Sequence, residues 1–157
     1  MAETTLREMT DADFAGWQDY SITEYAADKQ KALGIGAEAA LKLSRDSFAS
    51  LLPEGRTTPD HHLFLVMRDG ETLGWVWFKI ATEWGVTSAF VYDLEVKPEY
   101  RRQGVASTVM RLLEDEVRKH GATKIALHVF GQNTAARDLY LKAGYRISDY
   151  SMAKELG

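Results

Sequence analysis

Cysteine is absent from the 157 residues of this chain, and only three residues are proline. Without thiols, the chain can form no disulfide bond, no thiolate metal site and no covalent acyl-cysteine intermediate. No apolar run approaches the length of a membrane span, and residues 1–5 contain neither a basic region nor an apolar segment. We therefore expect a soluble cytoplasmic protein that has no membrane partner.

Neither sign of charge is in large excess. The chain has 19 basic and 23 acidic side chains and a net charge of −4, which argues against nucleic acid as a partner. A chain of about 150 residues buries roughly 70% of its extended surface on folding, which is enough for a core of its own. The length therefore predicts a single domain over residues 1–157.

The most informative stretch of the sequence is residues 91–106. Within it, Leu94 and Val96 alternate with Asp93 and Glu95 in the period of two that a strand imposes. Both carboxylates are therefore predicted to lie on one side of the strand, opposite the two apolar side chains.

A helix is predicted directly after this strand. Pro98 has no N–H to donate and ends the strand, and from Val105 to about Lys119 apolar residues recur at helical spacing. The apolar stripe of this helix comprises Val105, Val109, Leu112, Leu113 and Val117. The helix therefore begins within or just after a glycine-containing loop.

This loop has the properties of an anion site. The first N–H groups of a helix have no intrahelical partner and lie at the positive end of its dipole. Gly104 lets the backbone approach a ligand closely, and Arg101 and Arg102 add positive charge, so a diphosphate would suit the loop. An ordinary helix N-terminus with a flexible entry is the alternative interpretation.

Upstream of this stretch, the pattern predicts a short strand over 5–10, a helix capped by Thr10 or Asp11 and a second helix over 37–52. The inward-facing residues of the two helices are predicted to be Phe14, Trp17, Ile22, Tyr25 and Ala26, and then Leu41, Leu43, Phe48, Leu51 and Leu52. Antiparallel strands over 63–67 and 73–81 follow, with turns at 68–72 and 83–85 that lead into the central strand.

Downstream, residues 123–130 are predicted to form a strand parallel to the central one, which completes a βαβ unit. A short helix then opens near Asn133 and stops at Gly144. Its apolar face comprises Ala136, Leu139, Tyr140 and Ala143. Residues 145–147 and 150–153 are predicted to be two last strands.

Two motifs together resemble the GNAT superfamily of acetyl-coenzyme A-dependent N-acetyltransferases. They read Val96-x-Pro98-x-Tyr100-Arg101-Arg102-x-Gly104-x-Ala106 and Asn133-x-x-Ala136-Arg137-x-Leu139-Tyr140-x-x-x-Gly144-Tyr145. The resemblance implies an α+β (α/β mixed) fold whose central, mixed, mostly antiparallel twisted sheet has six to seven strands and about four flanking helices. It implies acetyl-CoA as co-substrate, no metal, and an amine acceptor that is a small molecule or a peptide. Dimers are common in this family, so the resemblance allows a homodimer.

The resemblance also implies roles for individual residues. The loop would hold the coenzyme A pyrophosphate through Arg101, Arg102, Gln103, Gly104, Val105, Ala106 and Ser107. The pantetheine arm would pair with the main chain of Leu94, Glu95 and Val96. Asn133 would hydrogen-bond the pantetheine region, Ala136 would pack near the cofactor, and Tyr140 would direct its hydroxyl at the sulfur.

Acetyl transfer to an amine requires a base for the amine and a proton for the departing thiolate. Asp93 and Glu95 are the candidate bases, acting directly or through water, and the sequence does not choose between them. Tyr140 is the candidate proton donor, with a buried structural tyrosine as the alternative, and Asn133 serves equally well as a helix N-cap.

Two further groups of side chains have simpler interpretations. His61 and His62 lack the additional ligands of a metal site and are predicted to lie on the surface. Trp75, Trp77, Phe78 and Trp84 could line an acceptor pocket, although most of them are predicted to be core residues.

A non-catalytic acyl-CoA sensor remains the rival interpretation of the two motifs, because cofactor binding alone would preserve the loop. A dinucleotide-binding domain is excluded, because a Gly-x-Gly-x-x-Gly motif is absent and antiparallel strands precede the loop.

Overall fold

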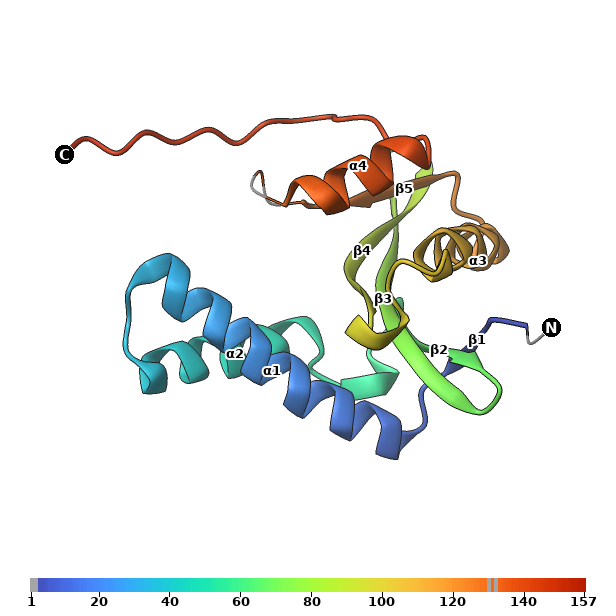
Figure 1. The fold of residues 1–157 in the computed structure, drawn as a ribbon, viewed down its shortest axis with the longest axis horizontal. Helices are drawn as coiled ribbons and strands as arrows, with labels where there is room; N and C mark the ends of the chain where they lie inside the picture. Colours follow the sequence, from blue (N-terminus) through green and yellow to red (C-terminus); the bar gives the residue numbers. More distant parts are fainter. Residues whose placement is uncertain (1–2, 130, 132) are drawn as a thin grey trace. The chain divides into compact units, whose positions relative to one another are not determined.

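The computed structural model describes residues 3–129, 131 and 133–157, which fall into two compact units divided after Leu127. The first unit contains five strands and three α-helices among its described residues, and the second contains one α-helix (Figure 1). The elements are β1 (Thr5–Glu8), α1 (Asp11–Leu33), α2 (Ala37–Leu51), β2 (His61–Arg68), β3 (Glu71–Glu83), β4 (Val86–Val96), α3 (Val105–Lys119), β5 (Lys124–Leu127) and α4 (Thr134–Lys142). Short 3-10 turns occupy Gly55–Thr57 and Pro98–Tyr100.

The strands form one sheet in the order β1-β2-β3-β4-β5, in which only the β4–β5 pair is parallel. The prediction of a mixed, mostly antiparallel sheet with about four helices is confirmed. The prediction of six to seven strands is wrong for the described residues, because 145–147 and 150–153 are not strands. Tyr150 and Met152 are 79% and 90% exposed, so these short alternating segments have no surface on which to bury an apolar face.

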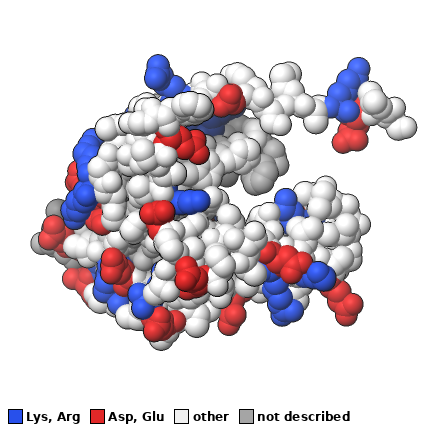
Figure 2. Space-filling model, turned by 180° about the vertical axis from the view of Figure 1, so that it is seen from behind, with Lys and Arg blue, Asp and Glu red and all other residues white. Residues whose placement is uncertain are grey.

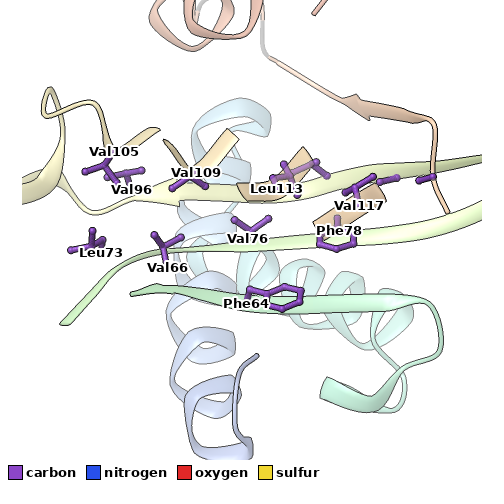
Figure 3. Packing of buried hydrophobic residues seen from close by; sticks show 13 residues of the cluster. Phe64, Val66, Leu73, Val76, Phe78, Val96, Val105, Val109, Leu113 and Val117 are labelled. Atoms are coloured by element: carbon purple, nitrogen blue, oxygen red, sulfur yellow. The ribbon is translucent and has the colours of Figure 1, made fainter. Parts of the chain in front are cut away.

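Helix α3 covers one face of the sheet. Its buried side chains recur at i, i+4, i+8 and i+12, which places them on one stripe against the strands, as Figure 3 shows. This first core comprises Phe64, Val66, Leu73, Val76, Phe78, Ala89, Val91 and Val96 from the sheet, Val105, Val109, Leu113 and Val117 from α3, and Ala122. The predicted bounds of the helix, Val105 to Lys119, are confirmed.

Helices α1 and α2 pack on the opposite face of the sheet through a second, mostly aromatic core. Trp17 lies at its centre, with its ring centroid 5.4 Å from that of Trp77 and 5.9 Å from that of Phe48. The Ser44 hydroxyl donates to Ile22 O at 2.7 Å and ties α2 to α1. The first unit is therefore a three-layer arrangement with the sheet in the middle.

The first turn of α1 is fixed by a capping box. Thr10 Oγ1 accepts from Asp13 N at 3.2 Å, and Asp13 Oδ2 accepts from Thr10 N at 2.9 Å. Gly34 ends the helix in the left-handed conformation, with a φ of 64°. Of the two predicted N-caps, Thr10 and Asp11, the structure selects Thr10, and the predicted break after Leu33 is confirmed. Helix α1 therefore presents a defined face to the sheet.

Two predictions of burial, those for Leu43 and His61, are wrong, and Trp84 is the exposed member of an aromatic group of which most were predicted to be core residues. Leu43 is 39% exposed. Trp84 is fully exposed because Trp84 and Gly85 form a two-residue turn in which both φ angles are positive. His61, predicted to lie on the surface, is only 8% exposed, and its Nδ1 accepts from Trp77 Nε1 at 2.9 Å. Burial lowers the pKa of His61, so this side chain is a neutral acceptor for a core indole.

In the second unit, α4 is capped at both ends. Asn133 Oδ1 accepts from Ala136 N at 3.2 Å, which is the N-cap interaction that the sequence allowed. At the other end Tyr145 N donates to Tyr140 O and Gly144 N to Leu141 O, with Gly144 at a φ of 96°. This pattern is the Schellman motif and explains why the helix stops there.

Acidic and basic side chains alternate over the face of the molecule that Figure 2 shows. That face has no broad basic stripe of the kind that follows a nucleic-acid backbone. Among the described residues, every helix is too short or too polar to serve as a transmembrane span.

Candidate functional site

The geometry of the site begins with a bulge in β4. Trp77 pairs with Asp93 but the next residue, Phe78, pairs with Val91, so Tyr92 is an extra residue on β4. The Tyr92 ring stacks on Trp77 at 4.7 Å, on the face covered by α1 and α2. The bulge therefore places Tyr92 and Asp93 on the same face, whereas Val91 and Leu94 pack with the α3 core.

Beyond the bulge, one edge of β4 has no strand partner among the described residues, and it is called the open edge below. The parallel pairing of β4 with β5 ends at Val91 and Leu127, while β4 itself continues to Val96. Lys97 N donates to Leu73 O in β3, so the main chain of Val96, one residue earlier, faces the other way. Among the described residues, no strand pairs with β4 on this side from Tyr92 to Val96, and an extended ligand could add there as a strand would.

Of the three residues predicted to bind pantetheine, Leu94 and Val96 present their main chain to the open edge, where Val96 O accepts from the Arg101 side chain. The carbonyl of Glu95 faces β3 instead, where it closely approaches Gly74. The main chain of Glu95 therefore faces β3 and not this edge, and the pairing predicted for Leu94 and Val96 stays a prediction.

The loop after β4 leads into an uncapped helix N-terminus. Arg102 and Gly104 both have positive φ angles, 62° and 76°, and no side chain caps α3. Thr108 N is the first amide to donate to Gly104 O, at 3.2 Å, so the amides of residues 105–107 have no intrahelical acceptor. A diphosphate fits this arrangement because it needs several N–H donors at the positive end of a helix dipole.

The other residues of the predicted loop are either exposed polar residues or residues that contact the core. Gln103 Nε2 donates to Glu99 O at 3.2 Å, and Ser107 is exposed at the start of α3. Val105 is buried in the core and Ala106 packs partly against it, which fixes the first turn of the helix. The predicted loop residues therefore form one continuous segment, with exposed polar groups on one side and core contacts on the other.

Arg101 connects this loop to the strand. Its Nε donates to Val96 O at 2.8 Å, and its Nη2 lies 3.6 Å from Glu95 Oε1. The guanidinium therefore holds the end of β4 against the loop, and it faces the carboxylate of a candidate base.

Glu95 projects into a cavity of about 460 Å³ between α1 and the sheet. Aromatic and acidic side chains dominate its walls, which are formed by Asp13, Gly16, Trp17, Tyr20, Leu65, Thr72, Trp75, Glu95, Lys97, Pro98 and Glu99. This volume is within the range of small-molecule sites.

Glu95 has two partners at the cavity. The Tyr20 hydroxyl donates to Glu95 Oε1 at 3.4 Å, and the Tyr20 ring meets the edge of Trp75 at 5.3 Å. Burial raises the pKa of Glu95 above its ordinary value; Arg101 and the Tyr20 hydrogen bond oppose this rise, and Glu24 and Asp28 add to it. A carboxylate whose pKa is raised is a stronger base for an ammonium group that enters the cavity.

Asp93 lies on the same face as Glu95, as the alternation predicts, but it is not part of the cavity wall. Its Oδ2 accepts from Trp75 Nε1 at 2.9 Å, so it holds the indole that forms the wall. Burial raises the pKa of Asp93 to about 6, and Glu95 adds to the rise. The Trp75 hydrogen bond lowers it, as does Trp17, although the Trp17 N–H does not meet ordinary hydrogen-bond geometry.

This pKa predicts a pH-dependent cost to stability. The unfolded Asp93 loses its proton near pH 4 and the folded one near pH 6, so the folded state holds more protons between these values and loses stability as pH rises. Relative to wild type, Asp93→Asn should therefore gain up to about 3 kcal/mol between pH 4 and pH 7. Urea unfolding of both proteins at four pH values measures this difference, and a difference that stays constant would show that the pKa of Asp93 is ordinary.

The remaining predicted site residues lie in the second unit. Asn133 caps α4, Ala136 is half-buried on the same helix, and the half-buried Tyr140 ring lies 5.6 Å from that of Tyr145. The structure therefore shows the contacts that these residues make within the second unit. The roles predicted for them toward the cofactor stay predictions. In the part of the chain that is described, no group of three or more His, Asp or Glu side chains could hold a metal ion.

Tyr20 is the main residue of the cavity that sequence reasoning missed. It follows Asp13 and Trp17 at helical spacing, so its place on their face of α1 could have been predicted. Its partner could not, because Glu95 is 75 residues away and the two meet only through the register of the sheet. Trp75 lines the cavity, whereas Trp77 and Phe78 belong to the two cores.

Comparisons with known proteins agree with this fold. The sequence profile of the acetyltransferase (GNAT) family matches residues 37–145, more than half of the chain. An uncharacterised N-acetyltransferase of Bacillus subtilis, YycN, is 36% identical over 152 residues, which are 96% of this chain and 97% of YycN. A second one, YdgE, also from Bacillus subtilis, is 29% identical over 97% of this chain and 98% of YdgE.

Solved structures show the same fold. The crystal structure of YycN superimposes with a TM-score of 0.89 at 34% identity, covering 98% of this chain and 99% of that one. The aminoglycoside N-acetyltransferase AAC(6')-Iy, solved with CoA, gives a TM-score of 0.63 at 17% identity, covering 99% and 95% of the two chains. With an open β4 edge, an uncapped α3 and a family profile that spans both, this chain belongs to the GNAT family of acetyltransferases.

Proposed function

We propose that this protein transfers an acetyl group from acetyl-CoA to a primary amine of a small molecule or peptide by direct attack within a ternary complex. Residues 1–157 would act as one acetyltransferase domain. The observation that carries the proposal is that the Glu95 carboxylate lines a cavity while the backbone on either side of it faces an open strand edge. An amine and a thioester could therefore meet across a single strand.

When bound, acetyl-CoA supplies the acetyl group: the amine nitrogen bonds to its carbonyl carbon as the carbon–sulfur bond breaks. The amides of residues 105–107 would hold the diphosphate, and the main chain of Leu94 and Val96 would hold the extended arm. Binding in this way would fix the reactive end of the ligand near the middle of β4.

Glu95 would serve as the base. An alkyl amine has a pKa near ~10.4, so it enters the cavity protonated and must lose one proton before it can attack. Glu95 Oε1 would accept this proton, directly or through water, and Tyr20 would orient the carboxylate. Asp93 would act indirectly by holding the Trp75 indole in place.

Tyr140 would supply the proton that the departing thiolate requires, since a phenol of pKa near ~10 can protonate a thiolate as it leaves. Tyr140→Phe should then lower turnover at least tenfold while leaving the affinity for coenzyme A nearly unchanged. Steady-state kinetics and calorimetry with coenzyme A test the two halves of this prediction. A variant that turns over as fast as the wild type would remove Tyr140 from the mechanism.

The proposed function is tested by release of free thiol from acetyl-CoA in the presence of a panel of amines, amino acids and peptides. Thiol release that depends on the acceptor supports an acetyltransferase. Heat of coenzyme A binding without acceptor-dependent thiol release would instead support the rival function, an acyl-CoA sensor. Absence of any heat with coenzyme A would contradict both.

A further inference from the structure

The side chain of Arg101 contacts both halves of the candidate site. Its Nε donates to Val96 O at 2.8 Å, and this carbonyl belongs to the open edge of β4. Its Nη2 lies 3.6 Å from Glu95 Oε1, and the Glu95 carboxylate lines the cavity between α1 and the sheet. One guanidinium therefore lies between the edge to which an extended ligand would add and the candidate base.

The contact at the edge occupies an acceptor that an added strand would use. A strand or extended ligand that pairs with β4 donates to its outward-facing carbonyls, which in this stretch are those of Leu94 and Val96. At 2.8 Å, Arg101 Nε takes the place of such a donor and leaves no room for a second N–H in the same direction. A ligand that continues along the edge to the amides of residues 105–107 therefore has to displace this side chain.

Displacement from the edge also ends the contact with the base. The guanidinium is a rigid planar group, so Nε cannot leave Val96 O without moving Nη2 away from Glu95. The Arg101 side chain is 54% exposed, so this movement disturbs little packing. The two contacts are therefore made and lost together.

The pair with Arg101 weakens Glu95 as a base. Burial has the largest effect on the pKa of Glu95 and raises it, and Arg101 has the next largest and lowers it, because a guanidinium stabilises the charged carboxylate. Among the described residues, Arg101 is the cation that forms an ion pair with Glu95. The other titratable and charged groups around this carboxylate are Tyr20, Glu24 and Asp28 of α1, Asp93 of β4, and Asp13, Lys97 and Glu99 of the cavity wall.

We propose that Arg101 couples the two halves of the site: it binds Val96 O and Glu95 while the open edge is empty, and an extended ligand that adds to this edge displaces it from both. Coenzyme A at the edge then converts Glu95 from the partner of a guanidinium into a free base. Arg101 acts through Glu95, so it is a positioning residue. This inference rests on the proposed function, which binds coenzyme A at this edge, and adds that binding activates the base.

Proton uptake on binding of coenzyme A tests the coupling. Calorimetry in buffers of different ionisation enthalpy counts the protons that the protein takes up as the ligand binds. Loss of Arg101 raises the pKa of Glu95, so in the acid range where Glu95 titrates the complex should hold more protons than the free protein. The difference between wild type and Glu95→Gln isolates the share of Glu95, since the phosphates of the ligand titrate in both. This share should peak at about 0.3 proton per coenzyme A, the size expected when one partly exposed ion pair is lost.

Two arginine variants, each measured with and without Glu95→Gln, identify the cause of the uptake. Arg101→Gln keeps a donor for Val96 O but has no charge to withdraw, so uptake by Glu95 should vanish. Arg102→Gln is the matched control, because Arg102 is exposed and takes part in no ion pair among the described residues, and it should keep the wild-type uptake. Uptake by Glu95 that persists in Arg101→Gln would overturn the inference, because the charge of the ligand itself would then be its cause. Equal uptake in wild type and Glu95→Gln would overturn it too, because Arg101 would then stay beside Glu95.

The calorimetry contains no acceptor, so failure of this inference differs from failure of the proposed function. If uptake by Glu95 is as expected but no amine releases thiol, the coupling stands and the acetyl transfer fails. Acceptor-dependent thiol release without this uptake would leave the acetyl transfer standing and refute the coupling. A crystal structure with coenzyme A is the second check: Arg101 Nε should have left Val96 O, and a bond that persists beside a ligand on the edge would also refute the coupling.

Discussion

Replacing Glu95 by glutamine should lower kcat/KM about 100-fold while leaving the fold and the affinity for coenzyme A nearly unchanged. Glutamine has almost the same volume and can still accept from Tyr20, so the variant removes mainly the ability to take a proton. General-base catalysis commonly contributes a factor of roughly 10² to 10⁴, and the lower end suits a site that water can reach. Steady-state kinetics over a range of amine concentrations at saturating acetyl-CoA measures the loss.

The pH profile distinguishes a base from a residue that only shapes the cavity. In the wild type, activity should fall as pH drops through the pKa of Glu95, which burial raises above the ordinary glutamate range. The glutamine variant should lose this acid limb, and Glu83→Gln, the same change at an exposed position on β3, should retain both the limb and the rate. A full rate for Glu95→Gln at neutral pH would exclude Glu95 as the base.

The sequence predicted the local elements well because their signals are local. The stripe from Val105 to Val117 fixed the bounds of α3, and Thr10 and Gly34 marked both ends of α1. The glycine-containing loop and the placement of Asp93 and Glu95 on one face also followed from neighbouring residues. These features depend on periods and caps that a few consecutive residues determine.

The roles of the two carboxylates could not be read in the same way. Asp93 and Glu95 are equivalent in the alternation, and what separates them is that Asp93 accepts from the Trp75 indole whereas Glu95 lines the cavity. The pairing of Tyr20 with Glu95 likewise depends on how α1 crosses the sheet. Sequence alone also added strands after Gly144, since a short alternating pattern does not reveal whether any sheet edge is there to receive it.

A single methyl group at Gly74 should destabilise the protein by about 3 kcal/mol or more. A Cβ built at this position overlaps the carbonyl oxygen of Glu95 and lies 3.0 Å from its carbonyl carbon and 3.1 Å from Val96 Cα. These are backbone atoms of the neighbouring strand, so no side-chain rotation relieves the clash, and β3 and β4 must move apart where β4 carries the candidate base. Overpacking of this kind typically costs 1–3 kcal/mol, and more where only backbone can yield.

Gly16→Ala provides the matched control. Gly16 lies inside α1, where an added Cβ meets nothing within 4 Å beyond its chain neighbours and the nearby backbone of its own helix. Alanine in a helix interior is favoured over glycine by roughly 0.5–1 kcal/mol. Urea unfolding should therefore show opposite signs for the same chemical change at the two positions. Because the clash at Gly74 displaces the Glu95 backbone, Gly74→Ala should also lose activity at temperatures at which it is still folded. A Gly74→Ala protein within 1 kcal/mol of wild type would show that β4 can shift freely at Glu95, and a base held by such a strand could not be positioned as we propose.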